Sequence, residues 1–240
     1  MVTCQFSRHY LRYLTVSVNL NNFSFFAFIK RTSVIIMDDE SYFSLSYEHY
    51  SNYYYTDGSE VDRSVRTRGK KKFEKKVMVW LAISANGRSE PFYHVTQGSV
   101  NGEVYANEII TKFLHPFIEN KHSGDNVPFW PDLATAHYSR VSTNMLQNLH
   151  IPFVPKELNP PCVPQARPIE KFWQHWKYKL YEDGWGARSI PELIERMNEK
   201  LQEFDHSYFS NLMRSVRSKI RKAVRFYFNT LFLRQWDSNR

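Results

Sequence analysis

Short, continuously apolar runs in the first half of this chain constrain its fold more than any other sequence feature. Val34–Met37 reads VIIM, Val77–Ser84 reads VMVWLAIS, and Val127–Trp130 reads VPFW. Runs of this length that are rich in β-branched and aromatic side chains are typical of strands buried on both faces. A sheet made of such strands must be covered by helices on both sides, which favours an α/β architecture.

Turn signals and neighbouring segments extend the predicted sheet. Tyr42–Tyr47 alternates enough to predict a strand next to the first apolar run. Asn86-Gly87 follows the second run and is a strong hairpin signal, with Pro91–Thr96 as the returning strand. Residues 48–69 are polar and tyrosine-rich, and we expect a loop or hairpin insertion there.

Helical periodicity follows in the second half of the chain. Ser189 and Glu192 have the spacing of a capping box, which predicts the start of a helix. Between the predicted helices, Ile151–Val154 is expected to form a further short strand. Amphipathic helices are predicted for 103–119, 139–149, 168–180, 189–204 and from about 207 onward.

This order of elements predicts an α/β fold of the RNase H-like type, a mixed sheet flanked by helices, with extra C-terminal helices. The 240 residues, 42% of them hydrophobic, suffice for one domain with a sizeable core. We expect this domain to span residues 31–223, after a leader of residues 1–30 and before a tail of residues 224–240. The apolar stretch in the leader is too short and too polar to predict a membrane helix.

Charge and cysteine content narrow the class of protein. The formal charge is +8, which fits a polyanionic partner, nucleic acid first and an acidic membrane surface second. The two cysteines, Cys4 and Cys162, form no CxxC pair, and the nine histidines form no HxxxH or HExxH pattern. The sequence therefore excludes a disulfide scaffold and gives no support to a zinc site.

Three acidic positions stand where a charged side chain is costly. Asp38-Asp39 follows one apolar run, Asp132 follows another, and Glu170 lies at the start of an amphipathic helix. Strand ends and helix starts meet at the edge of an α/β sheet, where sites usually form. Carboxylates gathered there need a cation, and oxygen ligands without histidine or cysteine indicate Mg²⁺ or Mn²⁺. For each acid alone, a turn or capping role is the more common alternative.

The acidic positions lie in sequence blocks that resemble the Tc1/mariner-type transposases. A block at Ile36–Tyr42 is similar to the first-aspartate motif of that family, in which the aspartate precedes a glutamate, so the resemblance selects Asp39 rather than Asp38. The other similar blocks are Phe129–Ala134 with Ala136–Ser139, Ile151–Lys156, Asn159–Pro161 and Arg167–Trp173. The resemblance covers about residues 31–222, and the 37 residues between the second and third acids match one branch of the superfamily.

The resemblance implies a DDE catalytic domain that cleaves DNA and transfers its 3′-hydroxyl into target DNA. Asp39, Asp132 and Glu170 would be the catalytic residues and would hold two Mg²⁺ or Mn²⁺ ions. Transposon ends and target DNA would be the partners, and the nucleus would be the location. The sequence predicts no membrane partner and leaves the oligomeric state open, a homodimer included.

Several basic residues are candidates for contact with DNA. Arg167 and Lys171 flank Glu170, where they could bind phosphate or pair with carboxylates, and His137 could contact phosphate or only organise a helix start. Glu40 is expected to support the site rather than to bind metal. The lysines that could grip the DNA backbone, or could belong to a solvated hairpin, are Lys70, Lys71 and Lys72.

Two other functions compete with the transposase prediction. The N-terminal residues resemble no helix-turn-helix unit of the kind that reads transposon ends in this family. The chain could therefore be a catalytically inactive or domesticated DNA-binding protein that retains the fold. A cellular RNase H or a resolvase is a third alternative, and it would cut hybrids or junctions instead.

Overall fold

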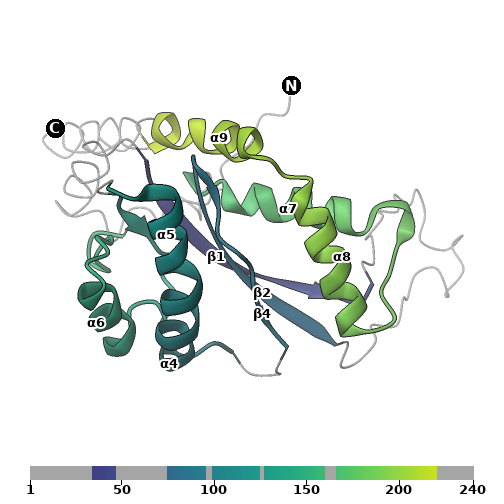
Figure 1. Cartoon of the computed structure of the whole chain (residues 1–240), viewed down its shortest axis with the longest axis horizontal. Coiled ribbons are helices and arrows are strands. Elements are labelled where there is room, and N and C mark those ends of the chain that lie inside the picture. The colour runs from purple at the N-terminus through teal and green to yellow at the C-terminus, as the bar shows by residue number, and fades with distance from the viewer. Residues whose placement is uncertain (1–33, 47–74, 96–98, 125–126, 160–165, 221–240) are drawn as a thin grey trace, which may run out of the picture.

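The computed structural model describes residues 34–46, 75–95, 99–124, 127–159 and 166–220 (Figure 1). A mixed five-stranded sheet has the order β3-β2-β1-β5, with β4 also paired to β2. β1 is antiparallel to β2 and parallel to β5. The strands are β1 (Ile36–Ser44), β2 (Lys76–Ser84), β3 (Gly87–Arg88), β4 (Phe92–His94) and β5 (Phe129–Trp130).

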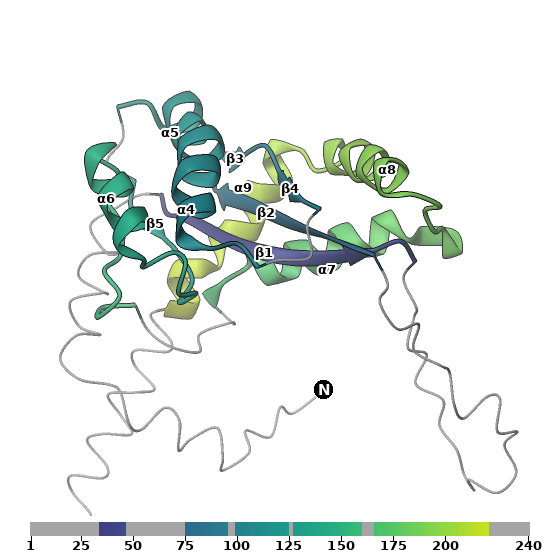
Figure 2. The ribbon, with the colours of Figure 1, turned by 90° about the horizontal axis from the view of Figure 1, so that it is seen from below.

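Helices cover both faces of the sheet, as the apolar strands require. One group comprises α4 (Gly102–Val104), η1 (Tyr105–Leu114), α5 (His115–His122) and α6 (Arg140–Asn148). The other comprises α7 (Ile169–Leu180), η3 (Glu182–Gly184), α8 (Ile190–Gln202) and α9 (His206–Arg214). Figure 2 shows α7 running alongside β1.

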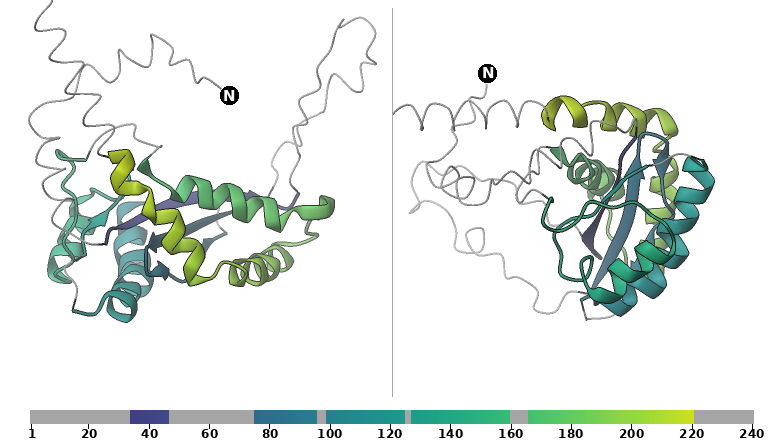
Figure 3. Two further views of the ribbon diagram at one scale, coloured as in Figure 1. Left: turned by 90° about the horizontal axis from the view of Figure 1, so that it is seen from above. Right: turned by 90° about the vertical axis from the view of Figure 1, so that its left-hand side faces the viewer.

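The strand periodicity of two divides the core into two clusters. Ile36 packs with η1 and α6, whereas Met37 packs with α7, α8 and α9. Neighbouring residues of β2 divide in the same way, with Trp80 in the first cluster and Leu81 in the second. The second view in Figure 3 shows the sheet between the two groups of helices. This two-sided burial confirms the predicted α/β class.

One strand prediction was wrong in a way that bears on the site. The structure has a single strand, β1, where the sequence predicted one strand ending before the acids and another beginning at Tyr42. Its pairing with β2 is continuous from Met37 to Ser44, so Asp38 and Asp39 lie inside the strand. The ladder continues because the carboxyl group of Asp38 finds hydrogen-bond donors within the core.

The helical predictions hold with local differences. The predicted helix at 103–119 is a run of helix from 102 to 122 whose middle part, η1, has π-type hydrogen bonding. α8 begins at its expected cap, where the Ser189 hydroxyl accepts from the Glu192 amide. Ile151–Val154 makes only an isolated bridge, Phe129↔Phe153, instead of a strand.

The predicted insertion at 48–69, the leader, Lys70, Lys71 and Lys72, and the tail beyond 223 lie outside the described residues. In the part of the chain that is described, no helix combines the length and apolar character needed to cross a membrane.

Candidate active site

The parallel pairing of β1 with β5 brings the segments that carry the first two predicted acids next to each other. Met37 pairs with Trp130, and Asp39 and Asp132 each follow their paired residue by two positions. α7 contacts β1 and carries Glu170, exposed, in its first turn. The segments that carry Asp132 and Glu170 therefore both adjoin β1, the strand that carries Asp39.

Asp39 faces α7 and interacts electrostatically with Glu170. The Trp173 indole Nε1 donates to Asp39 Oδ2 at 2.9 Å. Burial, and then the nearby Glu170 carboxylate, raise the pKa of Asp39 to about 7, although Arg167 opposes the shift. The two carboxyl groups thus repel each other when both are charged, so a bound cation would favour the ionised form of Asp39.

Asp38 faces the opposite side of the sheet, because adjacent residues of a strand alternate. It is fully buried, and its Oδ2 accepts from Trp80 Nε1 at 2.8 Å and from the Tyr105 hydroxyl at 2.6 Å. Burial raises the pKa of Asp38, and His137 opposes that shift. No local pattern in the sequence identifies hydrogen-bond partners for Asp38. Only the alternation of strand side chains could have indicated that two adjacent aspartates would lie in different environments.

His137 is buried and joins Asp132 to Glu40. Its Nδ1 lies 2.6 Å from Asp132 Oδ1, its Nε2 lies 3.0 Å from Glu40 Oε1, and Asp38 Oδ2 is 3.9 Å from Nε2. Although burial opposes the charged form, these three carboxyl groups raise the pKa of His137 well above its usual value. The imidazolium therefore compensates carboxylates from β1 and from the segment after β5.

Glu40, Asp132 and His137 also form a potential metal-binding group. One ligand atom from each lies within 4.8 Å of the others, and no other such group occurs among the described residues. Asp39, Asp132 and Glu170 are therefore not drawn together as closely as this in the structure. Sequence reasoning placed Glu40 in a supporting role and missed its link to Asp132 through His137.

Arg167 occupies the junction between the two aspartate-bearing segments. Its Nη1 donates to the carbonyls of Trp130 and Pro131, both at 3.2 Å, and its Nη2 donates to the carbonyl of Asp38. The guanidinium carbon lies 5.3 Å from the centre of the Trp130 ring. These carbonyls come shortly before Asp132 and Asp39, so Arg167 ties together the backbone that carries them.

Asn159 completes this junction from the loop that precedes α7. Its Nδ2 donates to the Pro131 carbonyl at 2.8 Å and to the Tyr138 hydroxyl at 2.7 Å, and its Oδ1 accepts from Trp130 Nε1 at 2.8 Å. The Asn-Pro-Pro block of the sequence therefore begins with a side chain that holds the end of β5.

The remaining predicted site residue within the described part is Lys171, which is exposed beside Glu170 in the first turn of α7. Sequence reasoning missed Lys177 on the same helix, whose Nζ lies 5.0 Å from the centre of the Phe43 ring. A search for residues seven positions after Glu170, about two helical turns, could have indicated it.

Comparisons with known proteins agree with this fold. No family model matches the chain, and no curated protein matches its sequence. Among solved structures, the catalytic domain of Mos1 mariner transposase is 15% identical, with a TM-score of 0.63 over 93% of this chain and 96% of that chain. A Mos1 transposase paired-end complex with the left transposon end is 16% identical, with a TM-score of 0.68 over 93% of this chain.

A Mos1 strand transfer complex is also similar, at 18% identity and a TM-score of 0.64 over 85% of this chain. The chain spans 64% and 58% of the Mos1 chains in the paired-end and strand transfer complexes. It has the RNase H-like fold of the Mos1 mariner transposase catalytic domain.

Proposed function

We propose that this chain is the catalytic domain of a Tc1/mariner-type DNA transposase, which cleaves DNA and transfers the resulting 3′-hydroxyl to target DNA. The observation that supports the proposal most is that β1, which carries Asp39, adjoins both β5, which ends two residues before Asp132, and α7, whose first turn places Glu170 near Asp39. The similar fold of the Mos1 catalytic domain, and the sequence blocks around each acid, support it.

The donor set fits divalent metal ions. Asp39, Asp132 and Glu170 offer carboxylate oxygens, which Mg²⁺ and Mn²⁺ prefer. The raised pKa of Asp39, about 7, means that its ionised form is disfavoured without a cation, and a bound cation would stabilise that form. Mos1 catalytic-domain structures with Mg and with Mn provide a parallel. A bound pair of ions would activate an attacking water or 3′-hydroxyl and stabilise the leaving oxygen of the phosphodiester.

The protein's own residues would orient and balance these ligands. Trp173 holds one oxygen of Asp39, and the His137 imidazolium lies against Asp132. Arg167 fixes the backbone before both aspartates. Since these groups come from the core, the carboxylates would be held in place before metal and DNA arrive.

Transposon ends and target DNA are the partners that follow from this proposal, with the nucleus as the place of action. The net charge of +8 suits a polyanionic partner. Mos1 structures named as paired-end complexes and as a transpososome support DNA binding and an assembly of more than one copy. A homodimer would bring two such centres to a pair of DNA ends.

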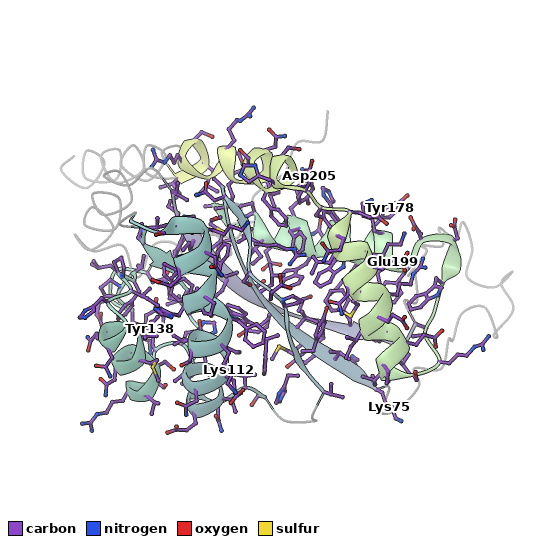
Figure 4. All side chains as sticks on the ribbon, viewed as in Figure 1. Lys75, Lys112, Tyr138, Tyr178, Glu199 and Asp205 are labelled. Atoms are coloured by element: carbon purple, nitrogen blue, oxygen red, sulfur yellow. The ribbon has the colours of Figure 1, made fainter. Side chains whose placement is uncertain are left out.

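Plasmid nicking tests the proposal. The purified chain is incubated with supercoiled plasmid and Mg²⁺ or Mn²⁺, beside Asp132→Asn and Glu170→Gln. Glu199→Gln is the matched control, because Glu199 is exposed on α8 (Figure 4). Nicking by the wild-type chain and the control, but by neither site variant, is expected. Equal nicking by wild type and Asp132→Asn, or none by either, would contradict the enzymatic proposal.

A second assay separates the proposal from related nucleases. Labelled DNA duplexes, RNA–DNA hybrids and four-way junctions are offered under the same conditions, and products longer than the substrate are sought. Joined DNA products support strand transfer. Cleavage confined to hybrids or junctions would identify an RNase H or a resolvase instead.

A further inference from the structure

Lys177 is a half-buried cation on α7 that lies close to the proposed active site. Its Nζ is 5.0 Å from the centre of the Phe43 ring. Among the residues that the structure describes, no carboxylate oxygen lies within 4.0 Å of this amine. Lys179 on the same helix offers a comparison, because it lies over the Phe204 ring at 5.7 Å and is paired with Glu203.

The packing of α7 on β1 places Lys177 in line with the carboxylates. Glu170 and Lys177 are seven residues apart and share one side of α7, since 3.6 residues make a turn. On β1, Phe43 lies four residues after Asp39 and on the same face, because side chains alternate along a strand. Lys177 therefore lies about 10 Å along α7 from Glu170, and its amine lies over the Phe43 ring of β1.

The negative charges near Lys177 do not fully offset the burial of its amine and the positive charge of Lys76. Burial lowers the pKa of Lys177 most, whereas the more distant Glu170 and Asp39 raise it and Lys76 lowers it. Lys76 is exposed at the start of β2 and pairs across the ladder with Ser44, the residue after Phe43. Two positive charges are thus held near one end of the α7–β1 pair. An anion at that point would offset both the desolvation and the mutual repulsion.

We propose that Lys177 binds a backbone phosphate of the DNA strand whose phosphodiester bond lies at the Asp39, Asp132 and Glu170 centre. This inference rests on the proposed function. Successive phosphates of one strand advance by about 3.4 Å along the duplex axis. For a DNA strand that runs along α7, a separation of about 10 Å between Glu170 and Lys177 places the contacted phosphate two or three nucleotides from the reacting bond.

The competing explanation is that Lys177 only balances the charge of Glu170 and Asp39. The two roles differ in what they predict for DNA. A phosphate contact releases a counterion and adds to the salt dependence of binding, whatever the DNA sequence. A residue that only balances Glu170 and Asp39 would alter metal affinity and would leave that salt dependence unchanged.

The test measures binding of a short fluorescein-labelled duplex by fluorescence anisotropy over a series of NaCl concentrations, with Ca²⁺ in place of Mg²⁺. Lys177→Met keeps the apolar stem over Phe43 and removes the charge. It should make the slope of log affinity against log salt less steep by about 0.9, the value of one phosphate contact. Lys177→Arg should restore the wild-type slope. Lys179→Met, the matched control on the same helix, should leave the slope unchanged.

Single methylphosphonate substitutions then locate the contact on the DNA. Neutralising the phosphate that Lys177 contacts should weaken binding by the wild-type chain and cause no further loss in Lys177→Met. This position should lie two or three nucleotides from the cut site, as estimated above from the geometry of α7 and DNA.

The outcomes separate this subsite from the proposed function. If Lys177→Met kept the wild-type slope of log affinity against log salt, or if Lys179→Met changed this slope equally, the proposed phosphate contact of Lys177 would be overturned. A Lys177-dependent slope in a chain that nicks no plasmid would overturn the proposed enzyme activity and leave the phosphate contact standing. Failure of the wild-type chain to bind the duplex at all would overturn both.

Discussion

Replacing Arg167 tests whether the junction between β1 and β5 depends on its guanidinium. Arg167→Met keeps an apolar stem over the Trp130 ring and removes three hydrogen bonds to the carbonyls of Trp130, Pro131 and Asp38. The Pro131 carbonyl keeps its bond from Asn159 Nδ2 at 2.8 Å. The change therefore removes the donor that links β1 to the end of β5 without opening a large cavity.

The expected cost is about 3 kcal/mol of unfolding free energy. A hydrogen bond from a charged donor contributes about 1.5–3 kcal/mol, and two of the three bonds are long, at 3.2 Å. We therefore count about one full bond and two weak ones. Loss of the cation also removes a charge that lowers the pKa of Asp39 and Asp132, which adds to the cost near neutral pH.

Urea denaturation followed by tryptophan fluorescence measures this loss. The midpoint should fall in Arg167→Met at an unchanged slope, whereas Arg188→Met, at an exposed arginine, should change stability by at most about 0.5 kcal/mol. Mn²⁺ should also raise the melting temperature of Arg167→Met less than that of the wild type, because the backbone before both aspartates is loosened. A loss below about 1 kcal/mol would refute the idea that Arg167 holds the junction together.

Three further changes test other contacts. The pKa of Asp39 is raised to about 7 from a usual value near 3.8, so this carboxyl group binds a proton more tightly in the folded chain than in the unfolded chain. Without metal, the stability of the folded chain should therefore fall as pH rises from about 4 to 7. Asp39→Asn should remove this decline and, at pH 8 in EDTA, stabilise the chain by an amount on the order of 2–4 kcal/mol. If wild type and Asp39→Asn gave the same melting curves at both pH 5 and pH 8, the raised pKa of Asp39 would be contradicted. Tyr105→Phe deletes a donor to the buried Asp38 and should cost about 1–3 kcal/mol in urea; a neutral result would show that the hydroxyl is dispensable. Gly102→Ala would place a Cβ atom 2.3 Å from Ser139 Oγ, too close to fit, so it should lower stability by about 1–3 kcal/mol, and an unchanged melting temperature would mean that α4 and α6 separate easily.

Much of the fold could be predicted because its signals are local. The apolar stripe from Ile169 to Leu180 predicted α7, and the cap at Ser189 predicted α8. Continuous apolar runs identified β2 and β5 as strands buried on both faces. Each of these patterns depends on residues within one or two turns of helix or a few positions of strand.

The predicted end of the first strand was wrong, because it depended on a local pattern of acidic residues that tertiary contacts override. Asp38 and Asp39 suggested the end of a strand, because a charged residue in a buried strand is costly. The structure continues the strand because Trp80 and Tyr105, 42 and 67 residues away, donate hydrogen bonds to Asp38. No local pattern contains those donors.

By itself, the sequence determined the helices, the apolar strands β2 and β5, and the positions of the candidate acids, and it indicated the RNase H-like order of these elements. Only the tertiary structure decided how those acids are held: His137 between Asp132 and Glu40, and Arg167 on the carbonyls before both aspartates. The physical reason is the distance along the chain over which the interactions act. Helix and strand preferences arise between close neighbours in the chain, whereas the free energy of a buried charge depends on groups that only folding brings within a few ångströms.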